Sequence, residues 1–236
     1  MNERKCPFLE TKTVLFCKGF PAKMIPLDRM SSVDCLCETD SFPECAVYSE
    51  ISHTAEGKES IHGFSIKSDY YYHPKHVWVA PTAENRCEAR VGIDDFAGRL
   101  IGRIDRVSVP AVGMPVKENS VCFLLHSGRR TARLAAPADG IIKAVNPRVV
   151  KNPSLLNEDP YAEGWIFSIR LKEDAVNGLY HGNVATKWFE SEVERLQRVF
   201  TSDLGMTATD GGEALTDISA RFNDAQWGKI ISQFLG

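Results

Sequence analysis

Alternating hydrophobic and polar side chains predict β-strands through the middle of the chain. From Trp165 to Leu171 every second residue is hydrophobic, which is the period of a half-buried strand. The β-branched run Ile141-Ile142 follows Asp139-Gly140, a dipeptide typical of turns because glycine accepts a positive φ at little cost. Between the two runs, Asn152-Pro153 places a capping residue before a proline, so we expect one helical turn there. The pattern predicts a β-rich core with an irregular loop.

A period near 3.6 residues predicts helices elsewhere. A short helix is expected from Asp94 to Gly102, because aspartate caps its start, Phe96 and Leu100 share a face, and glycine ends it. A longer one, over 186–200, has a single hydrophobic stripe against a charged face. After a polar break at 207–212 come two further stripes, which consist of Leu215, Ile218 and Phe222, and then of Trp227, Ile231 and Phe234. These C-terminal helices are expected either to dock on a partner or to pack on the β-rich part.

Between His73 and Leu171, six short segments stand in an order and spacing more specific than periodicity. They are His76-Val77-Trp78-Val79, Ala89 to Ala97, Leu100-Ile101-Gly102, Val109 to Gly113, Ala136 to Gly140 and Asn157 to Trp165. Together they resemble the H protein of the glycine cleavage system, a relative of the lipoyl domains. The resemblance implies a mainly β (α+β) fold, a barrel-sandwich hybrid of the H-protein/biotinyl-lipoyl type with C-terminal helices. It also implies a hairpin that carries a lipoyl-lysine into partner enzymes.

The lysine that the resemblance implies is missing from its expected place. The family's hairpin reads roughly Glu-Ser-Val-Lys-Ala, at a fixed distance before the proline of the next strand. Counting back from Pro137 gives His126-Ser127-Gly128-Arg129-Arg130, with Arg129 at the lysine position, and no lysine lies between Lys117 and Lys143. A guanidinium stays protonated and cannot replace the neutral amine that lipoylation needs. We therefore expect no lipoyl group.

The altered hairpin suggests a different role. Arg129 and Arg130 are adjacent, Arg133 follows, and His126 stands where the family has a glutamate. The family's glutamate before the tryptophan is likewise replaced, by Val77. Guanidiniums on a rigid turn suit a carboxylate, a phosphate or an acidic partner patch, because each can form bidentate charge-assisted bonds. The four hairpin residues are expected to form a recognition tip, or else to be a solvated turn whose charges keep the protein soluble.

Five of the seven cysteines lie within the first 45 residues, where hydrophobic side chains are few and scattered. A segment this short buries too little apolar surface to be stable by its core alone, and clustered cysteines without a secretory signal are typical of metal or redox chemistry. Four thiolates can hold zinc or an iron–sulfur cluster. We expect such a metal site at Cys6, Cys17, Cys45 and one of Cys35 or Cys37. Buried thiols, or a redox pair at Cys35 and Cys37, are the alternatives.

Two histidines and the two remaining cysteines are assigned structural roles. His73 and His76 stand three apart beside a strand, but a metal site is disfavoured because no carboxylate or cysteine is expected near them. Cys87 and Cys122 fall on strand patterns and are expected to be core thiols, since free cysteine packs as a small hydrophobic residue.

The chain is predicted to have four parts. Residues 1–50 form a cysteine-rich metal-binding module, 51–66 a polar linker, 67–201 the H-protein-like barrel-sandwich hybrid with its helix, and 202–236 a helical tail.

Composition and hydrophobicity exclude several classes of binding partner. A net charge of −3 gives no broad attraction to nucleic acid or to an anionic membrane. No apolar run approaches the roughly 18 to 20 residues of a membrane span. The N-terminus lacks the apolar core of a secretory signal, so we expect a cytoplasmic protein with protein partners.

No catalytic motif is present either: the sequence has no Gly-rich phosphate loop, nucleophile elbow or metalloprotease spacing, so we do not expect an enzyme. The leading hypothesis is a non-lipoylated, H-protein-like interaction or scaffold module with a metal-binding N-terminal domain. One alternative is a lipoyl carrier of the glycine cleavage system, which would require the family's lysine position to align with a residue other than Arg129. The other is a thiol- or metal-based redox sensor.

Overall fold

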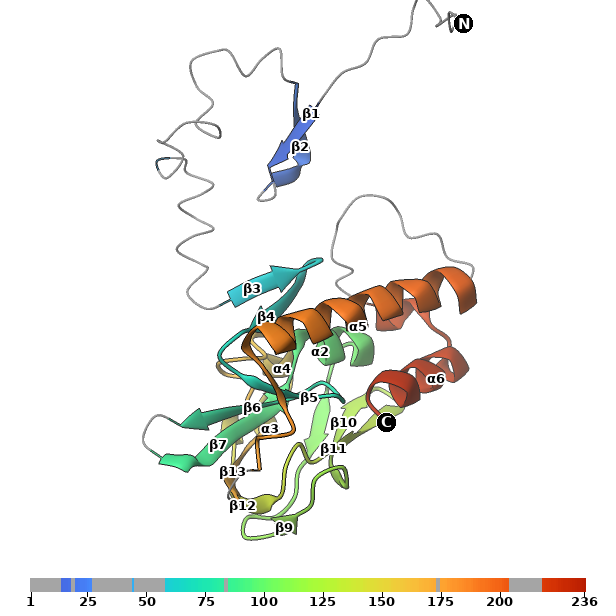
Figure 1. Cartoon of the computed structure of the whole chain (residues 1–236). Coiled ribbons are helices and arrows are strands. Elements are labelled where there is room, and N and C mark those ends of the chain that lie inside the picture. The colour runs from blue at the N-terminus through green and yellow to red at the C-terminus, as the bar shows by residue number, and fades with distance from the viewer. Residues whose placement is uncertain are drawn as a thin grey trace, which may run out of the picture. The chain divides into compact units, whose positions relative to one another are not determined.

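The protein, analysed as a computed structural model, is described over residues 14–17, 20–26, 44, 58–82, 85–172, 175–203 and 218–236. Its contacts divide it into two units (Figure 1). The smaller unit contains the antiparallel pair β1 (Val14–Cys17) and β2 (Phe20–Pro26). The larger unit contains every later element and carries the H-protein-like sequence.

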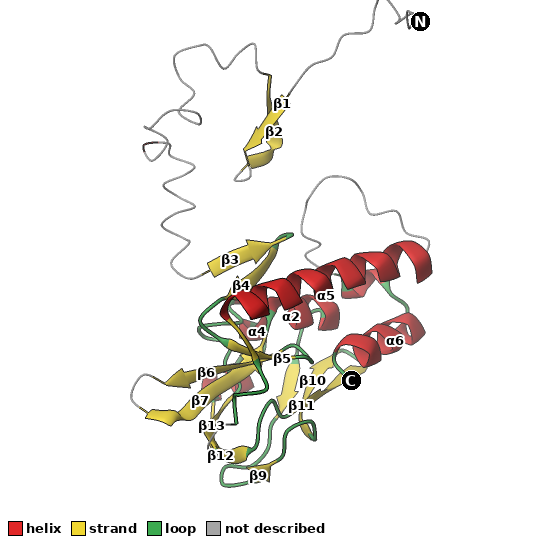
Figure 2. Cartoon of the chain, viewed as in Figure 1, coloured by secondary structure: helices red, strands yellow, loops and turns green. Residues whose placement is uncertain are grey.

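The larger unit is built mainly from strands, with the helices α2, α5 and α6 together on one side (Figure 2). Its strands are β3 (Lys58–Ile61), β4 (Phe64–Lys67), β5 (Tyr71–His73), β6 (Val77–Thr82), β7 (Asn85–Ile93), β8 (Arg106–Ser108), β9 (Pro115–Val116), β10 (Val121–Ser127), β11 (Arg130–Ala135), β12 (Gly140–Val145), β13 (Phe167–Leu171) and β14 (Tyr180–His181). Its helices are α2 (Asp95–Ile101), α3 (Pro147–Lys151), α4 (Leu155–Glu158), α5 (Gly182–Asp203), the 3-10 turn η4 (Ser219–Arg221) and α6 (Asp224–Phe234).

Two antiparallel sheets enclose one hydrophobic core. The larger has the order β14-β5-β6-β7-β13-β12-β9, and the smaller has the order β11-β10-β8. Phe123 on β10 and Phe167 on β13 meet in this core with ring centroids 5.7 Å apart. Trp78 is fully buried and packs against Gly92, where any side chain would clash with the indole ring. This arrangement confirms the predicted mainly β architecture with C-terminal helices.

Local capping signals set the short helices. Asp94 caps α2 by accepting a hydrogen bond from the Ala97 amide at 2.8 Å, and Gly102 ends the helix, as predicted. The expected single turn at Asn152-Pro153 is two short helices instead. Asn146 caps α3 with a proline at its first position, and α4 begins after Ser154 without a side-chain cap. The same asparagine–proline signal therefore acts six residues earlier than expected.

The C-terminal residues pack on the larger unit itself. The predicted stripe of α5 is buried, and its Phe189 meets Phe96 of α2 with centroids 6.0 Å apart. Residues 218–236, here called the C-terminal segment, bury Trp227 and Phe234 on the same helix α2. The indole Nε1 of Trp227 donates to the Leu100 carbonyl at 3.1 Å. Of the two roles expected for this segment, packing on its own barrel is the one observed.

The stretch 51–66, expected to be a linker, contains a hairpin. Strands β3 and β4 pair from Lys58↔Lys67 to Ile61↔Phe64, and Phe64 and Ile66 are buried in the core. Arg99 of α2 donates to the Gly63 carbonyl at 2.9 Å and fixes the turn. The alternating pattern here is short and its polar members dominate the composition, which is why it resembles a linker. The domain therefore begins before residue 67.

Candidate functional site

The β10–β11 hairpin places Arg129 at its tip. The two strands pair up to Ser127↔Arg130, which leaves a two-residue turn of Gly128 and Arg129. Gly128 has a φ of +58°, a conformation that favours glycine, and glycine at this first position is typical of a type II′ hairpin turn. The side chain of Arg129 is exposed and makes no hydrogen bond or ion pair to a described residue.

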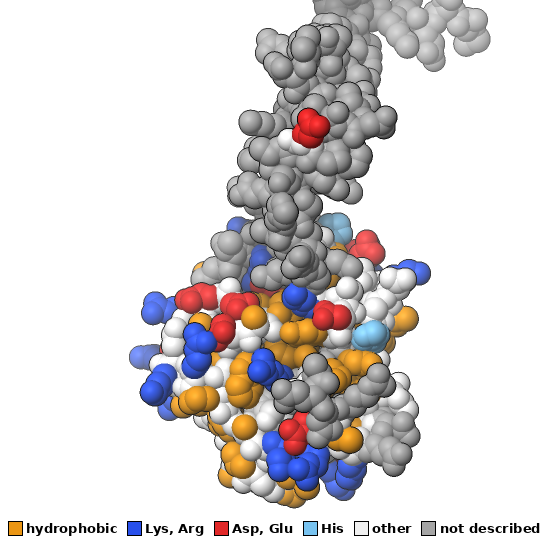
Figure 3. Space-filling view, turned by 90° about the vertical axis from the view of Figure 1, so that its left-hand side faces the viewer, with side chains coloured by type: hydrophobic (Ala, Val, Ile, Leu, Met, Phe, Trp, Pro, Cys, Tyr) orange, Lys and Arg blue, Asp and Glu red, His pale blue; other side chains and the backbone are white. Residues whose placement is uncertain are grey.

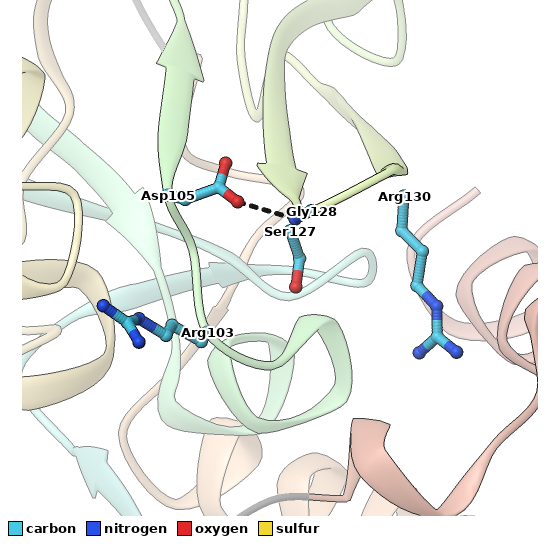
Figure 4. Close-up of a pocket in the computed structure, with 5 residues that line it drawn as sticks. All are labelled: Arg103, Asp105, Ser127, Gly128 and Arg130. Atoms are coloured by element: carbon cyan, nitrogen blue, oxygen red, sulfur yellow. Dashed lines mark hydrogen bonds between the residues drawn. The ribbon is translucent and has the colours of Figure 1, made fainter.

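An acidic residue outside the hairpin holds the turn in place. The Gly128 amide donates to the Asp105 carboxylate at 2.6 Å. Beside this bond lies an open cavity of about 500 Å³, bordered by Arg103, Ser127 and Arg130 as well (Figure 4). Arg103 and Arg130 extend to opposite sides of it (Figure 4). Sequence reasoning missed Asp105 because nothing local marks an aspartate that acts on an amide 23 residues away.

Arg130 is engaged by the chain's own C-terminal segment. Its guanidinium donates to the carbonyl oxygens of Ser219 at 3.0 Å and Phe222 at 2.6 Å, and to the Asp224 carboxylate at 2.8 Å. It also lies over the Trp227 ring, 5.5 Å from the centroid. This residue therefore fastens the hairpin to residues 219–227 and does not project into solvent.

His126 is buried beneath the hairpin. Its Nδ1 lies 3.0 Å from the Thr131 hydroxyl and 3.4 Å from Arg106, and its Nε2 lies 3.2 Å from the Ser108 hydroxyl. These contacts join β8, β10 and β11 on one face. Arg133, by contrast, is exposed on that face. Of the four residues expected to form a recognition tip, the structure exposes Arg129 and Arg133 and uses Arg130 and His126 internally.

A buried chain of charges lies under the helices. His76 is fully buried, with Nδ1 2.8 Å from the Asp94 carboxylate and Nε2 3.5 Å from Glu192 of α5. Glu192 lies 3.0 Å from the guanidinium of Arg195, which donates to the Gln233 carbonyl of α6 at 3.1 Å. The expectation that no carboxylate lies near this histidine is wrong. The fold brings Asp94 and Glu192 to it from distant parts of the chain.

The charges around His76 favour its protonated form. Burial by itself would lower its pKa, but the charge and hydrogen bond of Asp94, together with Glu192, outweigh burial and raise the pKa above the ordinary value. His73 behaves differently, because burial and the nearby Lys75 lower its pKa to about 4. Within the described ranges no group of three or more His, Cys, Asp or Glu residues could hold a metal ion. His76 is thus the centre of a structural ion network.

The structure describes some of the cysteines, and those of the larger unit differ in their exposure to solvent. Cys87 is exposed on β7, so the expectation of a core thiol is wrong there, because the side chain alternates to the solvent side. Cys122 is half-buried, and burial raises the pKa of its thiol to about 11. Cys17 ends β1. The remaining cysteines of the expected metal site, Cys6, Cys35, Cys37 and Cys45, lie outside the described residues.

Among the described residues, no helix has the length and hydropathy that crossing a bilayer requires.

Comparison with known proteins assigns the larger unit to a family. The family model described as glycine cleavage H-protein matches residues 70–192. The probable glycine cleavage system H protein 3 of Saccharolobus solfataricus is 34% identical over 139 residues, which cover 58% of this chain and 97% of that protein. The glycine cleavage system H protein of Thermobifida fusca is 36% identical over 110 residues, covering 47% of this chain and 85% of the relative.

Among solved structures, a crystal structure of a glycine cleavage system H protein from Mycobacterium marinum aligns with a TM-score of 0.48 and 30% identity, covering 54% of this chain and 99% of that one. The family match ends at Glu192, so the second half of α5, η4 and α6 lie beyond it.

Proposed function

The chain belongs to the glycine cleavage H-protein family, and we propose that it acts there as a protein-interaction module that carries no lipoyl group. The family assignment confirms that it is not itself an enzyme. The observation that carries the proposal is Arg129, which occupies the tip of the β10–β11 hairpin. A tip of this kind can bind a partner, but it offers no amine for acylation.

Two further features support the absence of a lipoyl group. Lysine is absent from the sequence between Lys117 and Lys143, so no register shift of the hairpin brings one to the tip. The contacts of Arg130 with Ser219, Phe222 and Asp224 also commit the residue after Arg129 to packing within the chain. The alternative, a lipoyl carrier of the glycine cleavage system, remains compatible with the family.

Co-expression with an octanoyl transferase and a lipoyl ligase separates these two functions. The Thermobifida fusca H protein, expressed in the same cells, is the positive control. We expect the control to gain the mass of a lipoyl group while this chain keeps the mass of its sequence. A stoichiometric lipoyl or octanoyl gain on this chain would establish the carrier function instead.

Arg129 is proposed to be the centre of the recognition tip. Arg133 on the adjacent strand and Arg103 across the cavity add exposed guanidiniums, while the carboxylate of Asp105 is used by the turn. A carboxylate, a phosphate or an acidic patch on a protein partner fits this arrangement, because guanidiniums bind such groups bidentately. We expect Arg129→Ala to weaken capture of a native partner from cell extract severalfold at unchanged thermal stability. Equal recovery with wild type and variant would reduce the hairpin to a solvated turn.

For the N-terminal cysteines we propose a metal, zinc or an iron–sulfur cluster, held by Cys6, Cys17, Cys45 and one of Cys35 or Cys37. The number of cysteines and their clustering within the first 45 residues support it, since thiolate ligation stabilises segments with little core. Elemental analysis and the absorbance spectrum of anaerobically purified protein distinguish the two metals. Metal-free protein with freely titrating thiols would favour the redox-sensor alternative, with Cys35 and Cys37 as the reactive pair. A cytoplasmic location, predicted from the sequence, completes the proposal.

A further inference from the structure

The end of the barrel that carries β9 exposes hydrophobic side chains. Six large hydrophobic residues are exposed within the described part of the chain, and four of them lie at this end. The four are Val112, Met114, Val121 and Ile141, whose exposed fractions run from 45% to 63%. Val112 and Met114 precede β9, and Ile141 lies on β12 directly opposite Pro115. Clustering of this kind is typical of contact sites, whereas single exposed hydrophobic residues are ordinary.

A groove of about 480 Å³ runs along the same end. Its floor is apolar and includes Val116, Ile141 and Leu171. β9 is one of the two edge strands of the seven-stranded sheet and is only two residues long, so the groove borders a sheet edge that pairs with no further strand among the described residues. A hydrophobic side chain entering the groove would therefore be buried against three strands, β9, β12 and β13.

Basic residues surround this apolar floor. Lys117, Arg170 and Lys172 line the groove, and Lys143 is exposed two positions beyond Ile141 on the same face of β12. Figure 3 shows Lys and Arg side chains beside hydrophobic ones at the lower end of the larger unit, where Figure 1 places β9.

The basic groups are only partly neutralised. Arg170 lies 3.7 Å from Glu88, and Lys172 lies 3.0 Å from Asp139, both pairs being well exposed to solvent. Lys117 and Lys143 form no ion pair with a described residue, although Glu118 follows Lys117 in the chain. The four basic residues Lys117, Lys143, Arg170 and Lys172 stand against three acidic ones, Glu88, Glu118 and Asp139, which leaves one positive charge at this end of a chain whose net charge is −3. Solvent-exposed ion pairs contribute little, so a partner's carboxylates can replace them at small cost.

From the apolar floor and its basic rim we infer that the groove binds a short segment of a partner protein in which hydrophobic side chains are flanked by Asp or Glu. The molecule already shows the same chemistry in cis, since Arg130 pairs with Asp224 while the neighbouring Trp227 is buried. The inference concerns a second surface of the proposed interaction module. It does not require Arg129 to be a recognition residue.

Two synthetic peptides test it on the full-length protein. Both contain a central Leu-Phe pair; one is flanked by Asp and Glu, the other by Lys. Binding is followed by methyl NMR shifts and by fluorescence anisotropy. We expect the acidic peptide to bind and to shift the methyl signals of Val116, Ile141 and Leu171, with weakening of about tenfold or more in Ile141→Ser and in Lys143→Glu. Val150→Ser, a matched change at an exposed position on α3, should bind like wild type.

Other outcomes overturn the inference. Equal binding of the basic peptide, or equal effects of Ile141→Ser and Val150→Ser, would show that the contact is non-specific. Loss of acidic-peptide binding in Arg129→Ala with Ile141→Ser unaffected would place the site at the hairpin. A concentration-dependent dimer in sedimentation that Ile141→Ser abolishes would mean that a second copy of this chain occupies the groove.

Discussion

Hydrophobic and basic side chains lie together at both ends of the barrel, but among the described residues only the hairpin end is covered by another segment of the chain. At the hairpin end, the C-terminal segment buries Trp227 on α2 and accepts three hydrogen bonds from Arg130. At the β9 end, Ile141 and Met114 remain exposed beside unpaired lysines within the described residues. One end shows how this surface chemistry is satisfied within the molecule, and the other end leaves it available to a partner.

The difference also bears on the hairpin. Because Arg130 is fastened to the C-terminal segment and Gly128 to Asp105, the turn presents Arg129 from a supported base. A rigid tip loses little conformational entropy when it binds, which favours recognition. The C-terminal segment therefore encloses the guanidinium of Arg130, and the hairpin that it supports holds Arg129 at the exposed tip.

Removing the cover should have the largest effect. Trp227→Ala deletes a buried indole and its hydrogen bond, so we expect the free energy of unfolding, measured in urea, to fall by about 3 to 5 kcal/mol. Met114→Ala, the matched change at the open end, should stay within about 0.5 kcal/mol. Similar losses at the two positions would contradict the assignment of one end as covered and the other as open.

The adjacent arginines sharpen the comparison further. Arg130→Ala leaves two backbone carbonyl groups without their charged donor, and we expect a loss of about 1.5 to 3 kcal/mol in urea unfolding. The carbonyl bonds account for most of this, because Asp224 is largely exposed and its ion pair is screened by solvent. Arg129→Ala removes the same side chain one residue earlier and should change stability by no more than about 0.5 kcal/mol. If both variants were equally stable, the clamp on the C-terminal segment would be absent in solution.

The stability of the end covered by the C-terminal segment should also depend on pH. We expect this effect to be smaller than those of the substitutions above, and its sign follows from the pKa of His76. The pKa of His76 is raised in the folded protein, so its protonated form contributes stability that is complete below the unfolded value of about 6.5 and is lost as pH rises through the folded pKa. Glu192 and Arg195 connect His76 to Gln233 of α6. As pH rises through the folded pKa of His76, we therefore expect amide hydrogen exchange in α6 to accelerate by more than the hydroxide catalysis of exchange accounts for. His76→Gln serves as the control, in which the excess should vanish. An unchanged excess would assign the effect to another group.

Local signals in the sequence predict the elements well where the cause is local. The cap at Asp94, the alternation of β13 and the stripe of α5 each act within one element, and each is present in the structure. The asparagine–proline signal shows the limit, because two copies stand six residues apart and only one caps a helix. Periodicity also gives little information about a four-residue strand, so the sequence predicts a linker where the structure has β3 and β4.

The site depends on contacts that no local pattern encodes. Arg130 meets carbonyl groups 89 and 92 residues further along the chain, and backbone acceptors carry no sequence signature. His76 obtains its second carboxylate from α5, whose Glu192 resembles any residue on the charged face of a helix. Sequence comparison with the H-protein hairpin located the tip, but only the fold separates the exposed Arg129 from the enclosed Arg130.

The central claim, that this H-protein family member is an interaction module and not a lipoyl carrier, is tested most directly on protein from its own cells. Peptide mass spectrometry covering 118–143 reads the hairpin in the state in which the cell uses it. We predict an unmodified mass for every peptide across Arg129, in protein isolated under conditions that preserve lipoyl groups on other proteins of the same extract. A lipoyl or octanoyl mass on any lysine of the chain, at stoichiometric yield, would contradict the account.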